Sequence, residues 1–160
     1  MKGKILKTLV LVGVLTLVVG AGQAWAQTLT VTAQVGRHCQ LGAGTLEFGD
    51  YDVLAAAEDT ATGTFQVRCT RAATPAQIGL DNGGNFLGGT RRMISGTQFL
   101  NYSLWRDVAR TLAWTTADRV SVDGTTNAWQ TLTVYGSIPA NQDMEADLSF
   151  TDTVNITVVF

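Results

Sequence analysis

Alternation of apolar and polar residues is the feature that most constrains the fold of this chain. In residues 28–35, Leu29, Val31, Ala33 and Val35 alternate with threonines and a glutamine. Successive side chains of a β-strand point to opposite faces, so the pattern puts the four apolar side chains on one face. It therefore predicts a strand over residues 28–35.

The same period of two recurs in short segments along the rest of the chain. Strands are expected at residues 39–41, 46–48, 64–70, 78–80, 99–106, 130–138 and 154–160, with glycine, asparagine and aspartate between them. The strand expected at residues 99–106 is rich in aromatic residues, and it is expected to be buried on both faces. Helix is expected at most as a single turn, near residues 55–58 or 108–116. Many short strands separated by turn residues predict an all-β sandwich or barrel.

Composition and charge exclude several classes of protein. Hydrophobic residues make up 46% of the 160 residues, which excludes a disordered chain. All three lysines precede residue 8, and the remaining eight arginines against thirteen acids give a net charge of -5. Phosphate binding needs a basic surface, so nucleic acid is not an expected partner. With one histidine, two cysteines and no Gly-x-Ser-x-Gly or His-Glu-x-x-His motif, we expect no catalytic residues, metal or cofactor.

The first 26 residues are typical of a secretory signal peptide. Three lysines form a basic start, an apolar run covers residues 9–19, and residues 24–26 read Ala-Trp-Ala, an A-x-A cleavage site. The apolar run is shorter than the roughly 20 residues that span a bilayer. We therefore expect cleavage before Gln27, export of the chain, and no membrane span in the mature protein.

Export changes what the two cysteines indicate. Cys39 and Cys69 are an even pair in an oxidising compartment, so a disulfide between them is expected. His38 directly precedes Cys39, but neighbours on a strand point to opposite faces. A catalytic Cys–His pair is therefore not expected.

Three local motifs each have a structural and a binding interpretation. Residues 81–85, Asp-Asn-Gly-Gly-Asn, favour a hairpin turn over a calcium loop, because the spaced carboxylates of such a loop are missing. Arg91 and Arg92 are expected to be exposed on a solvated edge. Three tryptophans are expected in a core or interface, and the alternative is a sugar-binding surface. They are Trp105, Trp114 and Trp129.

The two ends of the mature chain leave two interpretations open. The alternating segment 28–35 has no partner strand immediately after it, and the last strand runs to the final residue, Phe160. Either both strands close the fold of their own chain, or the first strand leaves its domain and completes a neighbour. Strand addition and closure within the chain use the same main-chain hydrogen bonds, so the pattern does not decide between them.

Motifs along nearly all of the mature chain carry a family resemblance. They are Leu-Thr-Val-Thr-Ala-Gln-Val at residues 29–35, Cys39, Gly-Thr-Leu-Glu-Phe-Gly at 44–49, Val-Arg-Cys-Thr at 67–70, Ile-Gly-Leu-Asp-Asn-Gly at 78–83, Asn-Tyr-Ser-Leu-Trp-Arg-Asp at 101–107, Thr-Val-Tyr-Gly-Ser-Ile-Pro-Ala-Asn-Gln at 133–142 and Phe-Thr-Asp-Thr-Val-Asn-Ile-Thr-Val-Val-Phe at 150–160. In this order they resemble the spore coat protein U domain family, which includes the subunits of archaic chaperone–usher pili.

The resemblance implies an immunoglobulin-like β-sandwich that is incomplete because its seventh strand is missing. A periplasmic chaperone, and then the next subunit at an outer-membrane usher, would supply that strand. Carried onto this sequence, residues 27–36 are the donor segment and residues 37–160 the incomplete domain. The donor side chains would be Leu29, Val31, Ala33 and Val35, and the family's disulfide would be Cys39–Cys69. The acceptor groove and chaperone contact would be formed by Val154, Ile156, Val158 and Phe160.

The function that the resemblance implies is structural. We expect a rod or adaptor subunit that polymerises head-to-tail by donor-strand exchange and serves adhesion and biofilm formation. The chain would pass through the periplasm to the surface of a Gram-negative bacterium. The alternative is a secreted or coat protein that completes its own fold, or a carbohydrate-binding module.

Overall fold

The computed structural model describes residues 27–72 and 75–160. The signal peptide expected at residues 1–26 lies outside the described residues. The chain divides into two units, residues 1–34 and residues 35–160. Within the described residues, every strand lies in the second unit.

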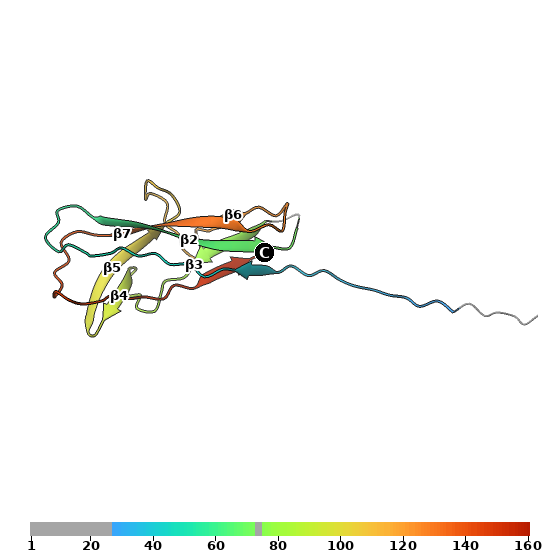
Figure 1. Ribbon diagram of the computed structural model, residues 1–160, viewed down its shortest axis with the longest axis horizontal. Helices are drawn as coiled ribbons and strands as arrows, with labels where there is room; N and C mark the ends of the chain where they lie inside the picture. Colours follow the sequence, from blue (N-terminus) through green and yellow to red (C-terminus); the bar gives the residue numbers. More distant parts are fainter. Residues whose placement is uncertain (1–26, 73–74) are drawn as a thin grey trace, which may run out of the picture. The chain divides into compact units, whose positions relative to one another are not determined.

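The domain is built from antiparallel strands (Figure 1), and the described residues include no helix. The strands are β1 (Cys39–Leu41), β2 (Asp59–Cys69), β3 (Ala76–Leu80), β4 (Arg91–Ser95), β5 (Gln98–Trp105), β6 (Val120–Val122), β7 (Gln130–Ile138) and β8 (Ile156–Val159). No helix in this part of the chain is long and apolar enough to cross a membrane. The all-β fold predicted from the alternation is confirmed.

Two sheets form the sandwich. The first has the order β1-β2-β7-β5-β4 and the second the order β6-β3-β8. The longest ladder joins β2 to β7, with Asp59 opposite Ile138 at one end and Val67 opposite Gln130 at the other. Strands β1 and β8 each lie at the edge of a sheet, so each has one edge without a partner strand among the described residues. This arrangement agrees with the incomplete immunoglobulin-like sandwich that the family resemblance implies.

The core lies between the sheets and follows from the alternation. In β2 the side chains of Phe65, Val67 and Cys69 are buried, while the residues between them are exposed. Trp114, which is only 1% exposed, packs on Phe65 with 5.8 Å between ring centroids. Its indole Nε1 donates a hydrogen bond to the Ile78 carbonyl at 2.9 Å. Burial of such alternating apolar faces is the main favourable contribution to folding.

Several local expectations are wrong. Residues 28–35 form no strand in the single chain, because a strand requires a partner ladder to satisfy its backbone groups. Residues 46–48 contribute no strand either, and only an isolated bridge joins Thr45 to Thr64 nearby. Strand β5 is buried on one face only. Neither of the single helical turns considered at 55–58 and 108–116 is present.

Two turn and edge assignments also differ. Residues 81–85 do not close a hairpin, because β3 pairs with β6 and β8 whereas β4 pairs with β5. They form a crossing between the two sheets. Arg91 does lie on an edge strand, as expected, but its side chain is 7% exposed and belongs to the interior.

Candidate functional site

A cleft of about 1120 Å³ opens in the domain and exposes the inner faces of its strands. Its floor is apolar and comes from β2, β3, β5 and β7. The floor residues are Phe65, Leu80, Leu100, Tyr102, Leu104, Val134 and Ile138. The cleft is larger than the roughly 300–1,000 Å³ of typical small-molecule sites. It is a gap in the core of the sandwich.

The first wall of the cleft is the segment of residues 44–54, which lies close against β2 and β7. Two glycines allow this approach. A Cβ atom at Gly63 would overlap the Thr45 carbonyl oxygen, and a Cβ atom at Gly136 would lie 2.6 Å from the Phe48 ring. Tyr51 fixes the far end of the segment by donating a 2.9 Å hydrogen bond from its hydroxyl to the Pro139 carbonyl.

The second wall consists of residues 144–152 together with Val154 and Ile156. Carboxylates hold this wall against the rest of the domain. Asp152 accepts hydrogen bonds from the Tyr102 hydroxyl at 2.6 Å and from the Gly84 amide at 2.9 Å. Burial and the bond to Asp152 raise the pKa of Tyr102, so the phenol stays protonated.

Asp81 fixes the start of the last strand. Its carboxylate accepts hydrogen bonds from the Asn155 backbone amide at 2.8 Å, from the Asn155 side-chain amide at 2.7 Å and from the Gly83 amide at 3.0 Å. Burial alone would raise the pKa of Asp81. The bonds from Asn155 and Gly83, with the charge of Arg91, outweigh it and lower that pKa. The ionised carboxylate therefore holds the entry into β8 in place.

Arg91 supports the same corner from inside the sandwich. Its guanidinium donates to the carbonyl oxygens of Asp81, Leu80 and Trp114, at 2.6, 3.2 and 2.9 Å from Nη2. Burial lowers the pKa of the guanidinium, and Tyr102 and Asp81 act in the opposite direction. A buried arginine is tolerated where its donors are satisfied, which is why this charged residue can occupy an interior position.

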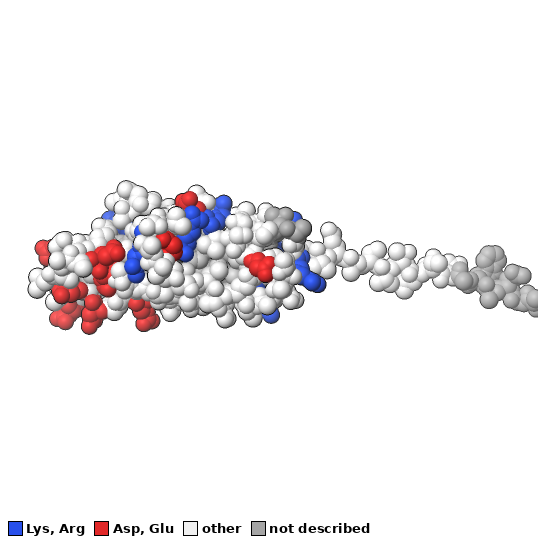
Figure 2. All heavy atoms as spheres, turned by 90° about the horizontal axis from the view of Figure 1, so that it is seen from above, with Lys and Arg blue, Asp and Glu red and all other residues white. Residues whose placement is uncertain are grey.

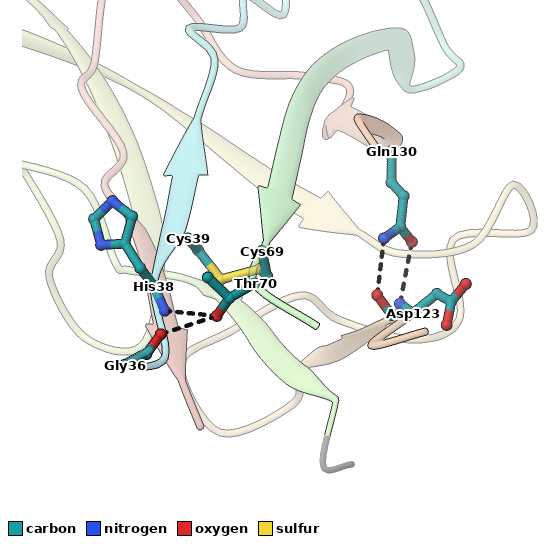
Figure 3. The surroundings of a disulfide bond; sticks show 7 residues. All are labelled: Gly36, His38, Cys39, Cys69, Thr70, Asp123 and Gln130. Atoms are coloured by element: carbon teal, nitrogen blue, oxygen red, sulfur yellow. Dashed lines mark hydrogen bonds between the residues drawn. A yellow bond between two sulfur atoms is a disulfide. The ribbon is translucent and has the colours of Figure 1, made fainter. Parts of the chain in front are cut away.

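The cysteines lie where the leader, residues 27–35, joins the domain. Cys39 and Cys69 form a disulfide between β1 and β2, as expected (Figure 3). Beside it, the Thr70 hydroxyl accepts a 3.0 Å bond from the His38 amide and donates to the Gly36 carbonyl. The disulfide and these bonds fix the first residues of the domain, including the exposed His38.

The four predicted donor side chains all lie in the leader and are exposed. Leu29, Val31 and Val35 are 87%, 82% and 86% exposed, and Ala33 is exposed as well. Isolated exposed apolar residues are ordinary, but an alternating set of four is a surface that favours burial.

The four predicted acceptor residues alternate along the last segment of the chain, and three of them pack against the core. Val154 and Ile156 line the cleft, whereas Val158 is partly buried opposite Ile78 and Phe160 is about half exposed. Most of the cleft comes from residues that sequence reasoning did not assign to it. The floor residues carry the signal of period two, as do Val154 and Ile156, but most residues of the two walls belong to no regular strand.

The tryptophans do not form one binding surface. Trp114 is in the core, and Trp105 is half-buried with its indole nitrogen 3.0 Å from the Ser137 hydroxyl. Trp129 is partly exposed and lies under the guanidinium of Arg68, 4.7 Å from the ring centroid. In the described residues, no group of three or more histidine, cysteine or acidic side chains is arranged to hold a metal ion.

Together these features define an incomplete immunoglobulin-like domain with an open apolar cleft and an exposed alternating leader. Comparison with known proteins identifies the family. The Spore Coat Protein U domain matches residues 25–157, and the chain belongs to this family. Protein U of Myxococcus xanthus is 32% identical over an alignment of 155 residues. The match covers 82% of this chain and 83% of that protein.

A solved structure shares the fold. It is the complex of CsuC and CsuE, a chaperone–tip adhesion subunit pre-assembly complex from the archaic chaperone–usher Csu pili of Acinetobacter baumannii. The match has a TM-score of 0.54 and 22% identity, and it covers 79% of this chain. This chain spans about two fifths, 40%, of the chain that it matches.

Proposed function

We propose that this protein is a non-catalytic subunit of a chaperone–usher pilus and polymerises by donor-strand exchange. The proposal rests on one observation: the same chain contains an open apolar cleft and an exposed apolar leader. An apolar cleft of about 1120 Å³ opens into the core, and four alternating apolar side chains are exposed in the leader. The leader of one copy fills the cleft of the next.

The physical chemistry of strand addition suits both parts. Burying Leu29, Val31 and Val35 contributes roughly 1.5–3 kcal/mol for each side chain, and less for Ala33. The added strand also satisfies the free backbone groups at the edges of β1 and β8. Because the contact joins different surfaces on two copies, it does not close on itself and generates a filament.

The partners follow from the same requirement. Before assembly, a periplasmic chaperone lends the strand that protects the apolar cleft. At an outer-membrane usher, the leader of the next subunit replaces it. The site of action is the cell surface, where the filament serves adhesion and biofilm formation as a rod or adaptor. Membership of the Spore Coat Protein U domain family and the fold shared with the Csu complex support this assignment.

The proposal is tested with the mature chain produced in the periplasm with its chaperone and then released from it. Unheated and boiled samples are compared on a denaturing gel, and the same material is imaged by electron microscopy. We expect a ladder that collapses to monomer only on boiling, together with thin fibres. A stable monomer in both lanes would instead favour a protein that completes its own fold.

Two leader substitutions refine this test. Val31→Asp places a charge on the apolar face that enters the cleft, and we expect it to abolish the ladder. Thr30→Asp adds the same charge one residue away, on the opposite face, and serves as the matched control. Ladders of equal length from both variants would contradict the proposed pairing.

A further inference from the structure

One end of the domain is acidic. The segments 46–59 and 139–150 meet there, because Asp59 pairs with Ile138 at the start of β2 and the end of β7. They contain eight of the thirteen acidic residues and no lysine or arginine. The eight, which define the acidic pole, are Glu47, Asp50, Asp52, Glu58, Asp59, Asp143, Glu145 and Asp147. Figure 2 shows acidic side chains clustered at the left end of the domain.

The opposite end is basic and carries the leader. Strand β1 begins where β2 ends, with Cys39 opposite Cys69, so the residues flanking these two cysteines lie at this end. The flanking residues that define the basic pole are Arg37, Arg68 and Arg71. Blue side chains appear at the right end of the domain in Figure 2. Asp123 belongs to a neighbouring loop, and its carboxylate is engaged by Thr125.

The cleft opens at the acidic pole, and strand β8 leads from it toward the basic pole. Five of the eight acids of the acidic pole line it: Glu47, Asp50, Asp52, Glu145 and Asp147. Strand β8 runs toward the basic pole, because Val159 pairs with Gln77 near the start of β3, which follows the end of β2 closely. A strand inserted antiparallel to β8 therefore enters at the basic pole and ends at the acidic pole.

This direction has a consequence for the body of the second copy. When its leader lies antiparallel to β8, Gly36 and Arg37 of that copy emerge at the acidic pole of the first. The basic pole of the second copy follows directly, since Arg37 is two residues from Cys39. Insertion in the parallel direction would bring two basic poles together. Like charges in contact are unfavourable, so the charges select the antiparallel direction.

We propose that successive copies of this protein contact each other pole against pole, with Arg37 and Arg71 of one copy facing Asp50 and Glu145 of the next. The inference rests on the proposed function, and it adds a second contact to the inserted strand. These four side chains are exposed and make no hydrogen bond in the described part of the chain. By contrast, Arg68 is engaged with Gln40.

Electrostatic attraction between such surfaces acts mainly on the rate of encounter and is screened by salt. We therefore expect the initial rate of fibre growth to fall as ionic strength rises. The variant Asp50→Asn with Glu145→Gln removes two of the eight charges of the acidic pole. We expect it to slow fibre growth about tenfold at low salt, within the range known for electrostatic steering. Fibres would still form, because the strand contact is intact.

The matched control adds the same charge elsewhere. Gln66→Lys with Val108→Lys raises the net charge by the same amount at two exposed positions outside the acidic pole. We expect this variant to grow at nearly the wild-type rate. Equal slowing of control and acidic-pole variant would attribute the effect to net charge and overturn the inference.

A charge swap makes the test specific. Asp50→Lys with Glu145→Lys, and separately Arg37→Glu with Arg71→Glu, are each expected to slow growth about tenfold or more. The quadruple variant has the wild-type net charge and reverses the sign of the charge at the four facing positions, while six acids of the acidic pole remain, so we expect it to recover part of the lost rate. Absence of recovery, or a wild-type rate that salt does not change, would overturn the pole contact while leaving donor-strand exchange standing. Absence of fibres from the wild-type chain would instead remove the proposed function.

Discussion

The Tyr102 hydroxyl donates a 2.6 Å hydrogen bond to the carboxylate of Asp152, linking the floor of the cleft to its second wall. Tyr102 lies on β5, and Asp152 precedes β8 by four residues. The same carboxylate also accepts the Gly84 amide. One side chain therefore joins strand β5 and the second wall to the crossing between the two sheets.

The variant Tyr102→Phe removes this bond and leaves the packing of the ring. Asp152 keeps its amide donors and loses only the bond from Tyr102, so we expect the free energy of unfolding to fall by about 1.5–3 kcal/mol, the usual contribution of a hydrogen bond to a charged group. Urea unfolding of wild type and variant at pH 7 measures the difference. An unchanged midpoint would show that the bond does not stabilise the wall.

Tyr102 also predicts behaviour at high pH. Its pKa is raised from the ordinary value of 10.0, so the folded protein binds the phenolic proton more tightly than the unfolded chain does. The stabilisation is complete below pH 10 and is lost progressively as the pH rises above that value. We expect the wild-type protein to lose stability above pH 10 more steeply than Tyr102→Phe. Parallel curves for the two proteins would contradict this assignment.

Asp81 predicts the opposite pH dependence. Its pKa lies below the ordinary 3.8, so its contribution is present above pH 3.8 and is lost as the pH falls below it. Asp81→Asn removes the charge that holds Asn155 and Gly83. We expect this variant to be less stable than the wild-type protein at pH 7 and the two to converge below pH 3.8. Thermal unfolding across roughly pH 2–7 measures the gap. A constant gap across this range would contradict the role of the ionised carboxylate.

The glycine in the middle of β2 is expected to be essential for the first wall. Gly63→Ala places a methyl group against the Thr45 carbonyl, which is backbone and cannot rotate away. We expect lower stability and slower fibre growth, because residues 44–48 must move from β2. Gly42→Ala is the control, since its added Cβ would lie an ordinary 3.4 Å from Gln66. Equal behaviour of the two variants would show that close approach of this segment is not required.

The disulfide is expected to stabilise the domain without taking part in strand exchange. Cys39 and Cys69 are 30 residues apart, and a loop of that length corresponds to roughly 3–4 kcal/mol of loop-closure entropy. Replacing both cysteines by serine is expected to lower the free energy of unfolding by that contribution, and the unfolding temperature falls with it. Calorimetry of the mature chain with and without reductant gives an independent measurement. A variant as stable as wild type would show that the β1–β2 ladder alone holds this edge.

Sequence patterns predicted the sheets better than the cleft. Period two identifies the buried face of β2 through Phe65 and Val67, because regular strands repeat a geometry that side-chain polarity follows. The segments 44–54 and 144–152 join no regular ladder, so the short alternation at residues 46–48 did not predict their position as walls of the cleft. The sequence predicts Arg91 at the surface. The three carbonyl oxygens that accept hydrogen bonds from its guanidinium come from distant segments, so no local pattern reveals them.

The leader shows a different limit of sequence reasoning. Its alternation predicts a strand, but in the single chain Val31 and its neighbours find no partner. Local pattern specifies which face of a strand is apolar. It does not specify which chain provides the adjacent strand, because the main-chain hydrogen bonds are the same in both cases.

The most direct measurement traps the leader of one copy beside β8 of another. One chain carries Val159→Cys, and its partner chain carries a single cysteine on the opposite face of the leader, at Thr28, Thr30, Thr32 or Gln34 in turn. The chains are mixed, released from chaperone, oxidised and run on a non-reducing gel after boiling. We predict a covalent heterodimer for at least one leader position. No heterodimer at any position, together with an internal disulfide when both cysteines are placed in one chain, would contradict exchange between copies.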